Sequence, residues 1–241
     1  MTLIFPMAGL SSRFTKAGYK KPKYMLPVDE NSVFYHAVNG FKNLFDDVHI
    51  LFICRDILDT REFIKSECEK MSLNDYEIVV LDKPTDGQAE TVYLGLKNSN
   101  VDLDDSLLIF NIDTFRPNFQ LPKELDFDKI DGYLEVFEAE GEHWSFVLSE
   151  NDETTKVTKT AEKERISNLC SSGLYYFRKA SDFKEIFEKI VAKNDRVKNE
   201  FFIAPMYNYL INQNKDIRYA KISLDEIVFC GTPDEYEKIK G

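Results

Sequence analysis

The sequence predicts an α/β protein built on a doubly wound mixed sheet. Apolar runs bounded by polar turns recur through the first half of the chain, as expected for strands that are buried on both faces. Segments with a helical spacing of apolar residues separate these runs, so that strand and helix alternate. The second half begins with strand-like segments, several of them joined by acidic turns. Such a pattern is typical of Rossmann-like folds with right-handed connections.

Four strands and three helices are expected in the first half. The strands are Leu3–Met7, Val48–Cys54, Glu77–Leu81 and Leu107–Ile112. The helices between them are Val33–Leu44, Ile57–Met71 and Gln88–Lys97. Ligands of such sheets bind beyond the carboxyl ends of the strands. Three segments should therefore meet there: the loop after Met7, the turn KPTDGQAE, and FNIDTF at the end of the fourth strand.

The second half of the chain, residues 116–241, is expected to mix strands and helices. The expected strands are Tyr133–Ala139, Ser145–Ser149, Lys156–Thr160, Gly173–Arg178 and Ile217–Ile222. The expected helices are Ser181–Ala192 and Phe201–Asn212. No linker rich in Pro, Gly or Ser separates this half from residues 1–115. We therefore expect one domain over residues 1–241, whose second half forms a lid or acceptor region over the first.

The charge balance bears on possible partners. Lys and Arg total 31 against 42 Asp and Glu, a formal net charge of -11, which argues against a broad nucleic-acid surface. No apolar run approaches the roughly 20 residues that cross a bilayer, so we expect no membrane insertion. The four cysteines are far apart and have no metal-binding or disulfide spacing, which favours a reducing cytoplasm.

The loop after the first strand departs from this acidic composition. It gathers five cations, Arg13, Lys16, Lys20, Lys21 and Lys23, which suits a small anionic ligand. Its small and hydroxyl residues let backbone N–H groups approach a phosphate chain and add donors; they are Ala8, Gly9, Ser11 and Ser12. The motifs GxxxxGK[ST] and GxGxxG are both absent. A surface loop with solvated lysines is the alternative interpretation.

The stretch PMAGLSSRF…KKPKYMLPV resembles the signature of the sugar-1-phosphate nucleotidyltransferases, the pyrophosphorylases that activate sugars. Its style is similar to that of the capsule and surface-polysaccharide members. The resemblance implies a GT-A-like nucleotidyltransferase fold with a nucleotide-binding first half and an acceptor-binding second half. Gly9, Arg13 and Lys23 match the family motif, in which the Arg and Lys hold the triphosphate and the transition state. Ser11 stands where the commonest family loop has a second glycine.

Two further segments carry the resemblance through the first half. TDGQAETV resembles the turn that recognises the nucleobase, which implies that Gly87 and Gln88 contact the base; without the family it is simply a helix N-terminus. Asp113 ends the fourth strand, where the family places a metal-binding Asp. A carboxylate there is a plausible ligand of Mg²⁺, which favours one or two carboxylates plus phosphate oxygens.

The acceptor side of the resemblance rests on AEKERISNLCSSGLYYF and IVFCGTPDEY. The first implies that Glu162 accepts hydrogen bonds from acceptor hydroxyls, that Lys163 binds the acceptor phosphate, and that Gly173 allows a close approach. An exposed charged turn is the alternative. In the second segment Phe229 occupies the place of a second metal-binding Asp, which leaves Asp225 or Glu226 as a candidate second ligand.

The predicted reaction transfers a nucleoside monophosphate from a nucleoside triphosphate, preferably a pyrimidine one, to a sugar-1-phosphate or sugar-like phosphate. Pyrophosphate leaves and no protein nucleophile is needed. One alternative is a cytidylyltransferase for phosphocholine or another small acceptor, with an aromatic cage drawn from Tyr175, Tyr176 and Trp144. The second alternative is a GT-A-type glycosyltransferase. Such an enzyme would normally carry Asp-x-Asp at the strand end, where NID supplies only Asp113. A non-catalytic nucleotide-binding protein is the third alternative.

Overall fold

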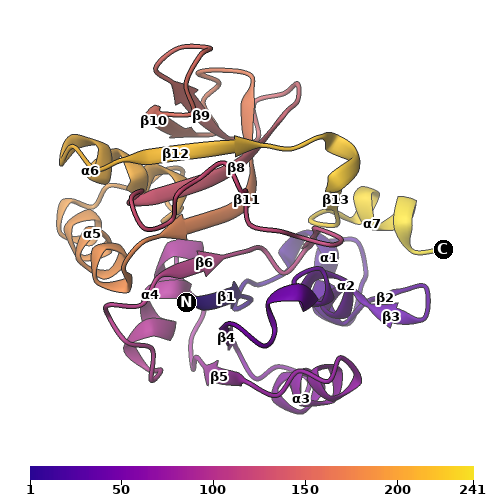
Figure 1. The fold of residues 1–241 in the computed structure, drawn as a ribbon. Coiled ribbons are helices and arrows are strands. Elements are labelled where there is room, and N and C mark those ends of the chain that lie inside the picture. Colours follow the sequence, from indigo (N-terminus) through magenta and orange to yellow (C-terminus); the bar gives the residue numbers. More distant parts are fainter.

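A nine-stranded mixed sheet forms the centre of the protein, in a computed structural model that describes all 241 residues (Figure 1). Four parallel strands from the first half lie in the order β5-β4-β1-β6. Their bounds are β1 Thr2–Pro6, β4 His49–Cys54, β5 Tyr76–Val80 and β6 Leu107–Ile109. The chain passes to opposite sides of β1 for β4 and β6, so a ligand crevice is expected beyond its carboxyl end.

Five strands from the second half extend the same sheet. Their bounds are β8 Gly132–Glu138, β9 Ser145–Ser149, β10 Val157–Glu162, β11 Leu169–Phe177 and β12 Ile217–Lys221. β11 pairs antiparallel with β6 and β9 along one edge and with β8 along the other. The register of β11 and β8 shifts between Ser171 and Tyr175, so β11 is irregular around Gly173.

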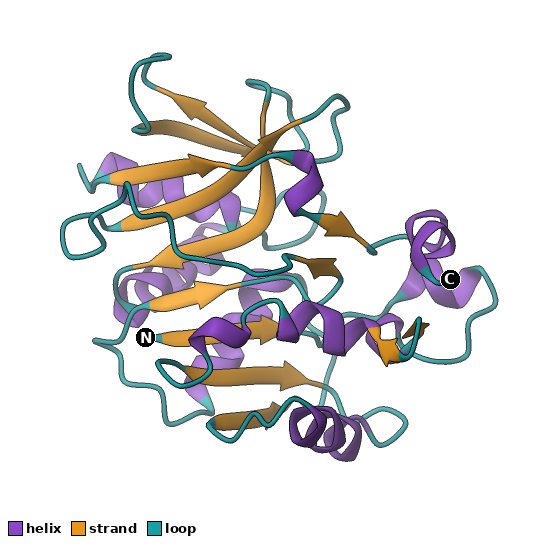
Figure 2. Cartoon of the chain, turned by 45° about the vertical axis from the view of Figure 1, so that its right-hand side comes forward, coloured by secondary structure: helices purple, strands orange, loops and turns teal.

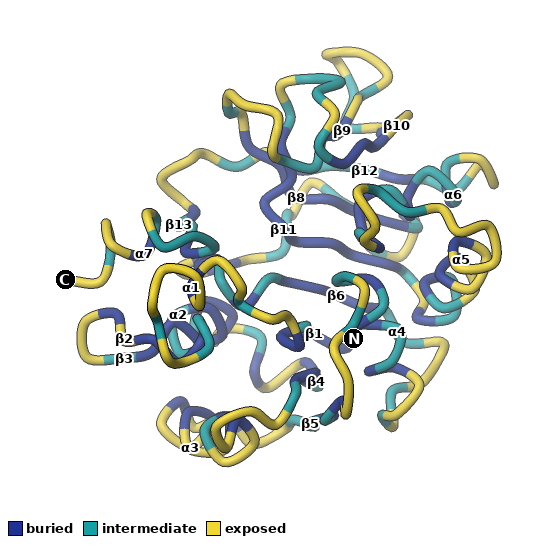
Figure 3. Tube along the Cα trace, turned by 180° about the vertical axis from the view of Figure 1, so that it is seen from behind, coloured by how far each residue is buried: buried dark blue, intermediate teal, exposed yellow.

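Helices cover both faces of the sheet, which confirms the doubly wound architecture (Figure 2). α2 (Val33–Asn39) and α3 (Thr60–Lys70) pack on one face, and α4 (Gln88–Lys97) and α5 (Ala180–Lys193) on the other. Along β1, the side chains of Leu3 and Phe5 pack in the apolar core on the α2 and α3 face. The side chain of Ile4 packs in the core on the α4 and α5 face. The central strands are buried while much of the opening loop is exposed (Figure 3).

Short elements complete the fold. They are α1 Ser12–Lys16, η1 Lys23–Met25, β2 Pro27–Val28, β3 Asn31–Ser32, η2 Lys42–Leu44, β7 Thr114–Phe115, η3 Ala204–Met206, α6 Tyr207–Asn212, η4 Leu224–Glu226, β13 Val228–Phe229 and α7 Pro233–Ile239. β13 pairs antiparallel with β7, which brings the C-terminal segment beside Asp113. No helix is both long and apolar enough to span a membrane.

The structure corrects several expected boundaries. The strand expected from Gly173 begins at Leu169, and the helix expected from Ile57 begins at Thr60. The helix expected over Val33–Leu44 ends at Asn39, and a separate 3-10 turn, η2, covers Lys42–Leu44. The strand expected to reach Ile112 ends at Ile109. The helix expected from Phe201 begins later, because the backbone of Phe201 is bonded to Asp86 and Ala89 around the start of α4.

Candidate active site

A cavity of about 540 Å³ lies where the opening loop, the turn before α4 and the end of the β6 segment meet. We call it the nucleotide cavity. Seven of the candidate site residues from the sequence analysis line it: Gly9, Ser11, Ser12, Lys23, Gly87, Gln88 and Asp113. Ala8 is buried beneath the loop and does not line the cavity. The three segments therefore share one crevice at the carboxyl ends of the strands.

The opening loop is shaped by local backbone geometry. Ser11 has a left-handed conformation (φ 49°) and directly precedes α1. Its Oγ accepts a hydrogen bond from the backbone N–H of Lys23 at 3.4 Å, which ties the two ends of the loop together. A Cβ on Gly9 would meet no atom within 4 Å, so the space beside this residue is open. The loop thus presents an accessible backbone beside its cations.

Lys23 and Asp113 form an ion pair at the floor of the nucleotide cavity. Their side chains are only 24% and 17% exposed, so the pair is partly shielded from water. The bond joins Lys23 Nζ to Asp113 Oδ2, and Oδ1 has no protein partner. The cation and the carboxylate that the family resemblance assigns to phosphate and to Mg²⁺ are therefore side by side.

Asn111, which the sequence analysis missed, connects the turn before α4 to β11. Gln88 Nε2 donates to Asn111 Oδ1 at 2.5 Å. A Cβ on Gly173 (φ +89°) would lie 2.1 Å from Asn111 Nδ2, so a protein side chain makes a close approach at this glycine. Gly87 (φ +134°) is likewise pressed against protein, because a Cβ would lie 2.4 Å from the Phe201 carbonyl oxygen. The sequence offered one signal for Asn111, its place in FNID beside Asp113.

A second cavity, of about 240 Å³, adjoins the first; we call it the acceptor cavity. Gln88, Asn111 and Asp113 line both cavities. The rest of the acceptor cavity combines polar groups with aromatic side chains; among them are Arg13, Glu162, Gly173, Glu235, Trp144, Tyr175, Phe202 and Phe229. Arg13 therefore faces the acceptor cavity and lies outside the lining of the nucleotide cavity.

Glu162 is the buried carboxylate of the acceptor cavity. It is 8% exposed, and burial raises its pKa above the usual value despite a hydrogen bond from Ser145 Oγ and the nearby Lys163. Lys163 Nζ lies 3.8 Å from Glu162 Oε1 and 4.2 Å from the centre of the Phe202 ring. Tyr175 OH donates to Ser145 Oγ at 3.5 Å, and burial raises the pKa of Tyr175 to about 12. Tyr175 therefore stays protonated, as a donor, at neutral pH.

Only two of the three proposed cage residues reach this cavity. Trp144 and Tyr175 line it, whereas Tyr176 points into the core on the other face of the sheet and packs on Phe127 at 5.0 Å. Phe229 stacks beside Trp144, with ring centroids 5.0 Å apart. The aromatic residue at the place of the expected Asp thus belongs to the wall of the acceptor cavity.

The candidate second metal ligand Asp225 is exposed on η4 and lines neither cavity. Glu235, in the first turn of α7, faces Asp113 across Gly231 instead. A Cβ on Gly231 would lie 3.0 Å from Asp113 Oδ2 and 3.7 Å from Glu235 Oε2, so only a glycine leaves this space open. No group of three or more His, Cys, Asp or Glu residues gathers anywhere in the structure. Two carboxylates that face one gap fit Mg²⁺ completed by phosphate oxygens.

The α/β fold and these adjoining cavities have the arrangement that the sequence analysis expects of a nucleotidyltransferase. No protein-family model matches the sequence, and a search of curated proteins finds no match. Among solved structures, a nucleoside-diphosphate-sugar pyrophosphorylase from Vibrio cholerae RC9 is 44% identical over 98% of both chains, with a TM-score of 0.93. The chain therefore belongs to the sugar-1-phosphate nucleotidyltransferase family, and it is a nucleotidyltransferase.

More distant structures share the fold alone. An apo UDP-glucose pyrophosphorylase is 16% identical, with a TM-score of 0.75 over 99% of this chain and 96% of that one. The inositol-1-phosphate CTP transferase from T. maritima is 13% identical, with a TM-score of 0.72 over 97% and 90%. The same fold therefore occurs in proteins named for different acceptors and nucleotides.

Proposed function

We propose that the protein transfers a nucleoside monophosphate from a nucleoside triphosphate to a sugar-1-phosphate or a similar small phosphate. The observation that carries this proposal is the junction of the two cavities at Gln88, Asn111 and Asp113. An oxygen of the acceptor phosphate attacks the α-phosphorus, a new P–O bond forms, and the bond to the β-phosphate oxygen breaks. Pyrophosphate leaves with the electron pair, so the reaction balances without a protein nucleophile.

The residues of the opening loop neutralise and position the phosphates. Lys23 supports the α-phosphoryl group, because its Nζ lies at the floor of the nucleotide cavity beside Asp113. Backbone N–H groups and hydroxyls of Ser11 and Ser12 hold the triphosphate chain. Arg13 contributes a planar pair of donors from the side of the acceptor cavity, where the attacking phosphate enters.

The acceptor is held by the far wall of its cavity. Glu162, in the lining of the acceptor cavity, accepts hydrogen bonds from acceptor hydroxyls. Lys163, which lies beside Glu162 but outside that lining, binds the acceptor phosphate. Gln88 contacts the base, held in place by Asn111. The absence of a side chain at Gly173 leaves room for Asn111, which lines the acceptor cavity beside the acceptor.

Mg²⁺ is the proposed cofactor, and Asp113 and Glu235 are the residues that would hold it together with phosphate oxygens. The ion would neutralise charge on the triphosphate and favour departure of pyrophosphate. The preference for a pyrimidine triphosphate, the cytoplasmic location and the link to capsule or surface-polysaccharide synthesis remain predictions from the sequence.

A phosphocholine-type acceptor is the second candidate, because Trp144, Phe229 and Tyr175 give the acceptor cavity an aromatic wall next to the carboxylate of Glu162. Pyrophosphate release measured with CTP, UTP, dTTP and GTP against a panel of sugar-1-phosphates and phosphocholine distinguishes the two. We expect release only when a triphosphate and a sugar-1-phosphate are both present. Pyrophosphate release with a triphosphate and phosphocholine, but with none of the sugar-1-phosphates, would favour the second candidate. No release with any pair of triphosphate and acceptor would contradict the proposed function.

A further inference from the structure

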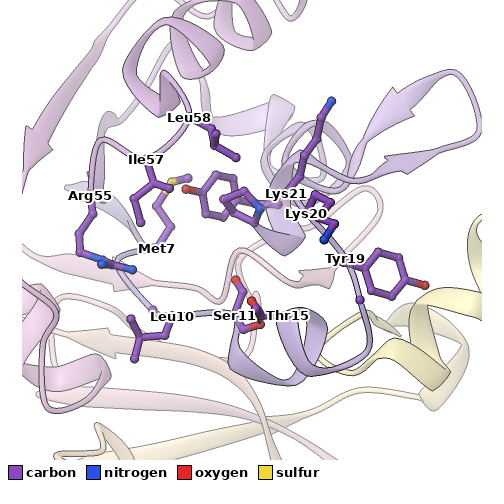
Figure 4. Close-up of a pocket in the computed structure, with 14 residues that line it drawn as sticks. Met7, Leu10, Ser11, Thr15, Tyr19, Lys20, Lys21, Arg55, Ile57 and Leu58 are labelled. Atoms are coloured by element: carbon purple, nitrogen blue, oxygen red, sulfur yellow. Dashed lines mark hydrogen bonds between the residues drawn. The ribbon is translucent and has the colours of Figure 1, made fainter.

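A third cavity, of about 250 Å³, lies behind the opening loop, between this loop and the segment that follows β4 (Figure 4). We call it the rear cavity. Arg55 and Ile57 stand on one side of it, and Lys20 and Lys21 on the other (Figure 4). Both the rear cavity and the nucleotide cavity are lined by Met7, Gly9, Leu10, Ser11 and Tyr24. The start of the opening loop, with Tyr24 near its end, therefore forms a wall that the two spaces share.

The charge of the rear cavity is opposite to that of the protein. Lys20, Lys21 and Arg55 line it, and no Asp or Glu does, although the chain carries a net charge of -11. None of these three cations forms an ion pair. Arg55 Nε donates to the Ala8 carbonyl oxygen at 3.0 Å, which orients the guanidinium while its terminal N–H groups keep no protein partner. Three unpaired cations that line one cavity, without a carboxylate in the same lining, favour an anionic ligand.

The rear cavity also has an apolar rim. Leu10, Ile57 and Leu58 are 60%, 37% and 59% exposed, and they are three of the seven large hydrophobic side chains that the protein leaves exposed. Leu58 and the following Asp59 both have left-handed backbones, with φ of 53° and 57°. Such a conformation is costly for a bulky residue and is most often kept at functional segments. The strained segment holds Leu58 beside the cavity, where an apolar part of a ligand would cover it.

We propose that the rear cavity binds a second nucleoside phosphate, with the phosphates on Arg55, Lys20 and Lys21 and the nucleoside against Leu10, Ile57 and Leu58. The choice of a nucleoside phosphate rests on the proposed function, which supplies this chemistry as both substrate and product. A ligand there touches the back of the Gly9–Ser11 stretch, whose front forms a wall of the nucleotide cavity. Occupancy of the rear cavity should therefore change the affinity of the nucleotide cavity.

Binding stoichiometry tests the proposal directly. Titration calorimetry with UTP, without an acceptor, should give two sites per chain. The double change Lys20→Ala/Lys21→Ala and the change Leu58→Glu should each leave one site and retain pyrophosphate release. Lys23→Ala should weaken the other site and keep the rear one. Lys16→Ala is the control for a lost loop cation, and Leu103→Glu, at an exposed leucine elsewhere, is the control for the added charge; both should retain two sites.

Separate titrations identify the source and nature of the ligand. UTP represents the substrate, UDP-glucose the product class, and inorganic pyrophosphate the anion without a nucleoside. Tighter binding of UTP or of UDP-glucose at the rear cavity assigns the source. A single site in the unchanged protein, or equal binding of pyrophosphate there, would overturn the proposal. Because stoichiometry is measured without turnover, this result is independent of whether the proposed transfer reaction occurs.

Discussion

Arg116 and Glu135 form an ion pair inside the protein, and removing one partner should be costly. Their side chains are 5% and 2% exposed. Arg116 Nε and Nη2 donate to the two oxygens of Glu135 at 2.9 and 3.0 Å, and Nη1 donates to the Glu226 carbonyl oxygen at 2.7 Å. Arg116 follows β7 directly and lies three residues after Asp113. Its guanidinium thus links this segment to both β8 and η4.

Arg116→Met removes the charge and all three hydrogen bonds but retains much of the apolar volume. It leaves Glu135 buried without its cation, and breaking a buried pair in this way costs about 3–5 kcal/mol. Glu135→Leu in the same chain should recover part of that loss, because no uncompensated charge remains. Ser172 Oγ, which donates to Glu135 Oε1 at 2.9 Å, loses its partner in the double variant, so recovery should be incomplete.

Urea unfolding of the unchanged protein, both single variants and the double variant gives the coupling free energy. Asp104→Asn is the control, because its partner Lys179 is exposed and such pairs contribute little. Burial raises the pKa of Glu135 above its usual value, although the hydrogen bonds and charge of Arg116 lower it. Without Arg116 the folded variant keeps a proton that the unfolded chain releases, so its stability should fall as pH rises. A loss below about 1 kcal/mol for Arg116→Met, or additive losses in the double variant, would refute this reasoning.

Three further predictions concern the site. Lys23→Ala should lower the rate of pyrophosphate release about 100- to 1000-fold with the fold retained, because one contact to the transition state is lost. Lys16→Ala is the control. Equal, mild effects of the two changes on pyrophosphate release would contradict the role of Lys23. Glu235→Gln should weaken Mn²⁺ binding, measured by electron paramagnetic resonance, about 10-fold or more. The new amide can still accept the hydrogen bond from the backbone N–H of Thr232. Asp234→Asn is the control and should leave Mn²⁺ affinity unchanged, and equal affinities of the two variants would exclude Glu235 as a ligand. The pKa of Glu162 is raised in the folded state, so the folded protein binds the extra proton and this stabilisation is lost as pH rises above the usual Glu value. Glu162→Gln should therefore gain stability relative to the unchanged protein as pH rises from 4 to 8 in urea unfolding, and a constant difference would disprove the shift.

Local residue patterns predicted the strands of the sheet, its helices and the edge of the sheet at which the two cavities lie. Strands buried on both faces need helices on both sides, and parallel strands end at one edge, so local periodicity predicted that the opening loop, Gln88 and Asp113 would lie together. The strand Ser145–Ser149 and the helix Gln88–Lys97 have the expected bounds. The helix starting at Gln88 begins after Gly87, and its polar first turn was readable locally.

The side chains that come to the site from distant parts of the chain could not be predicted from the sequence and depend on how the strands are ordered. Asp225 and Glu226 were the carboxylates considered upstream of Phe229, yet Glu235 faces Asp113, because β13 pairs with β7 and turns the chain back through Gly231. The contact of Asn111 with Gln88 and its approach to Gly173 depend on β11 lying beside β6. Arg55, Lys20 and Lys21 meet for a similar reason, since the β4 segment and the opening loop are adjacent only in the folded sheet. Strand order fixes these contacts, and residue periodicity within a segment carries no information about which other segment will lie beside it.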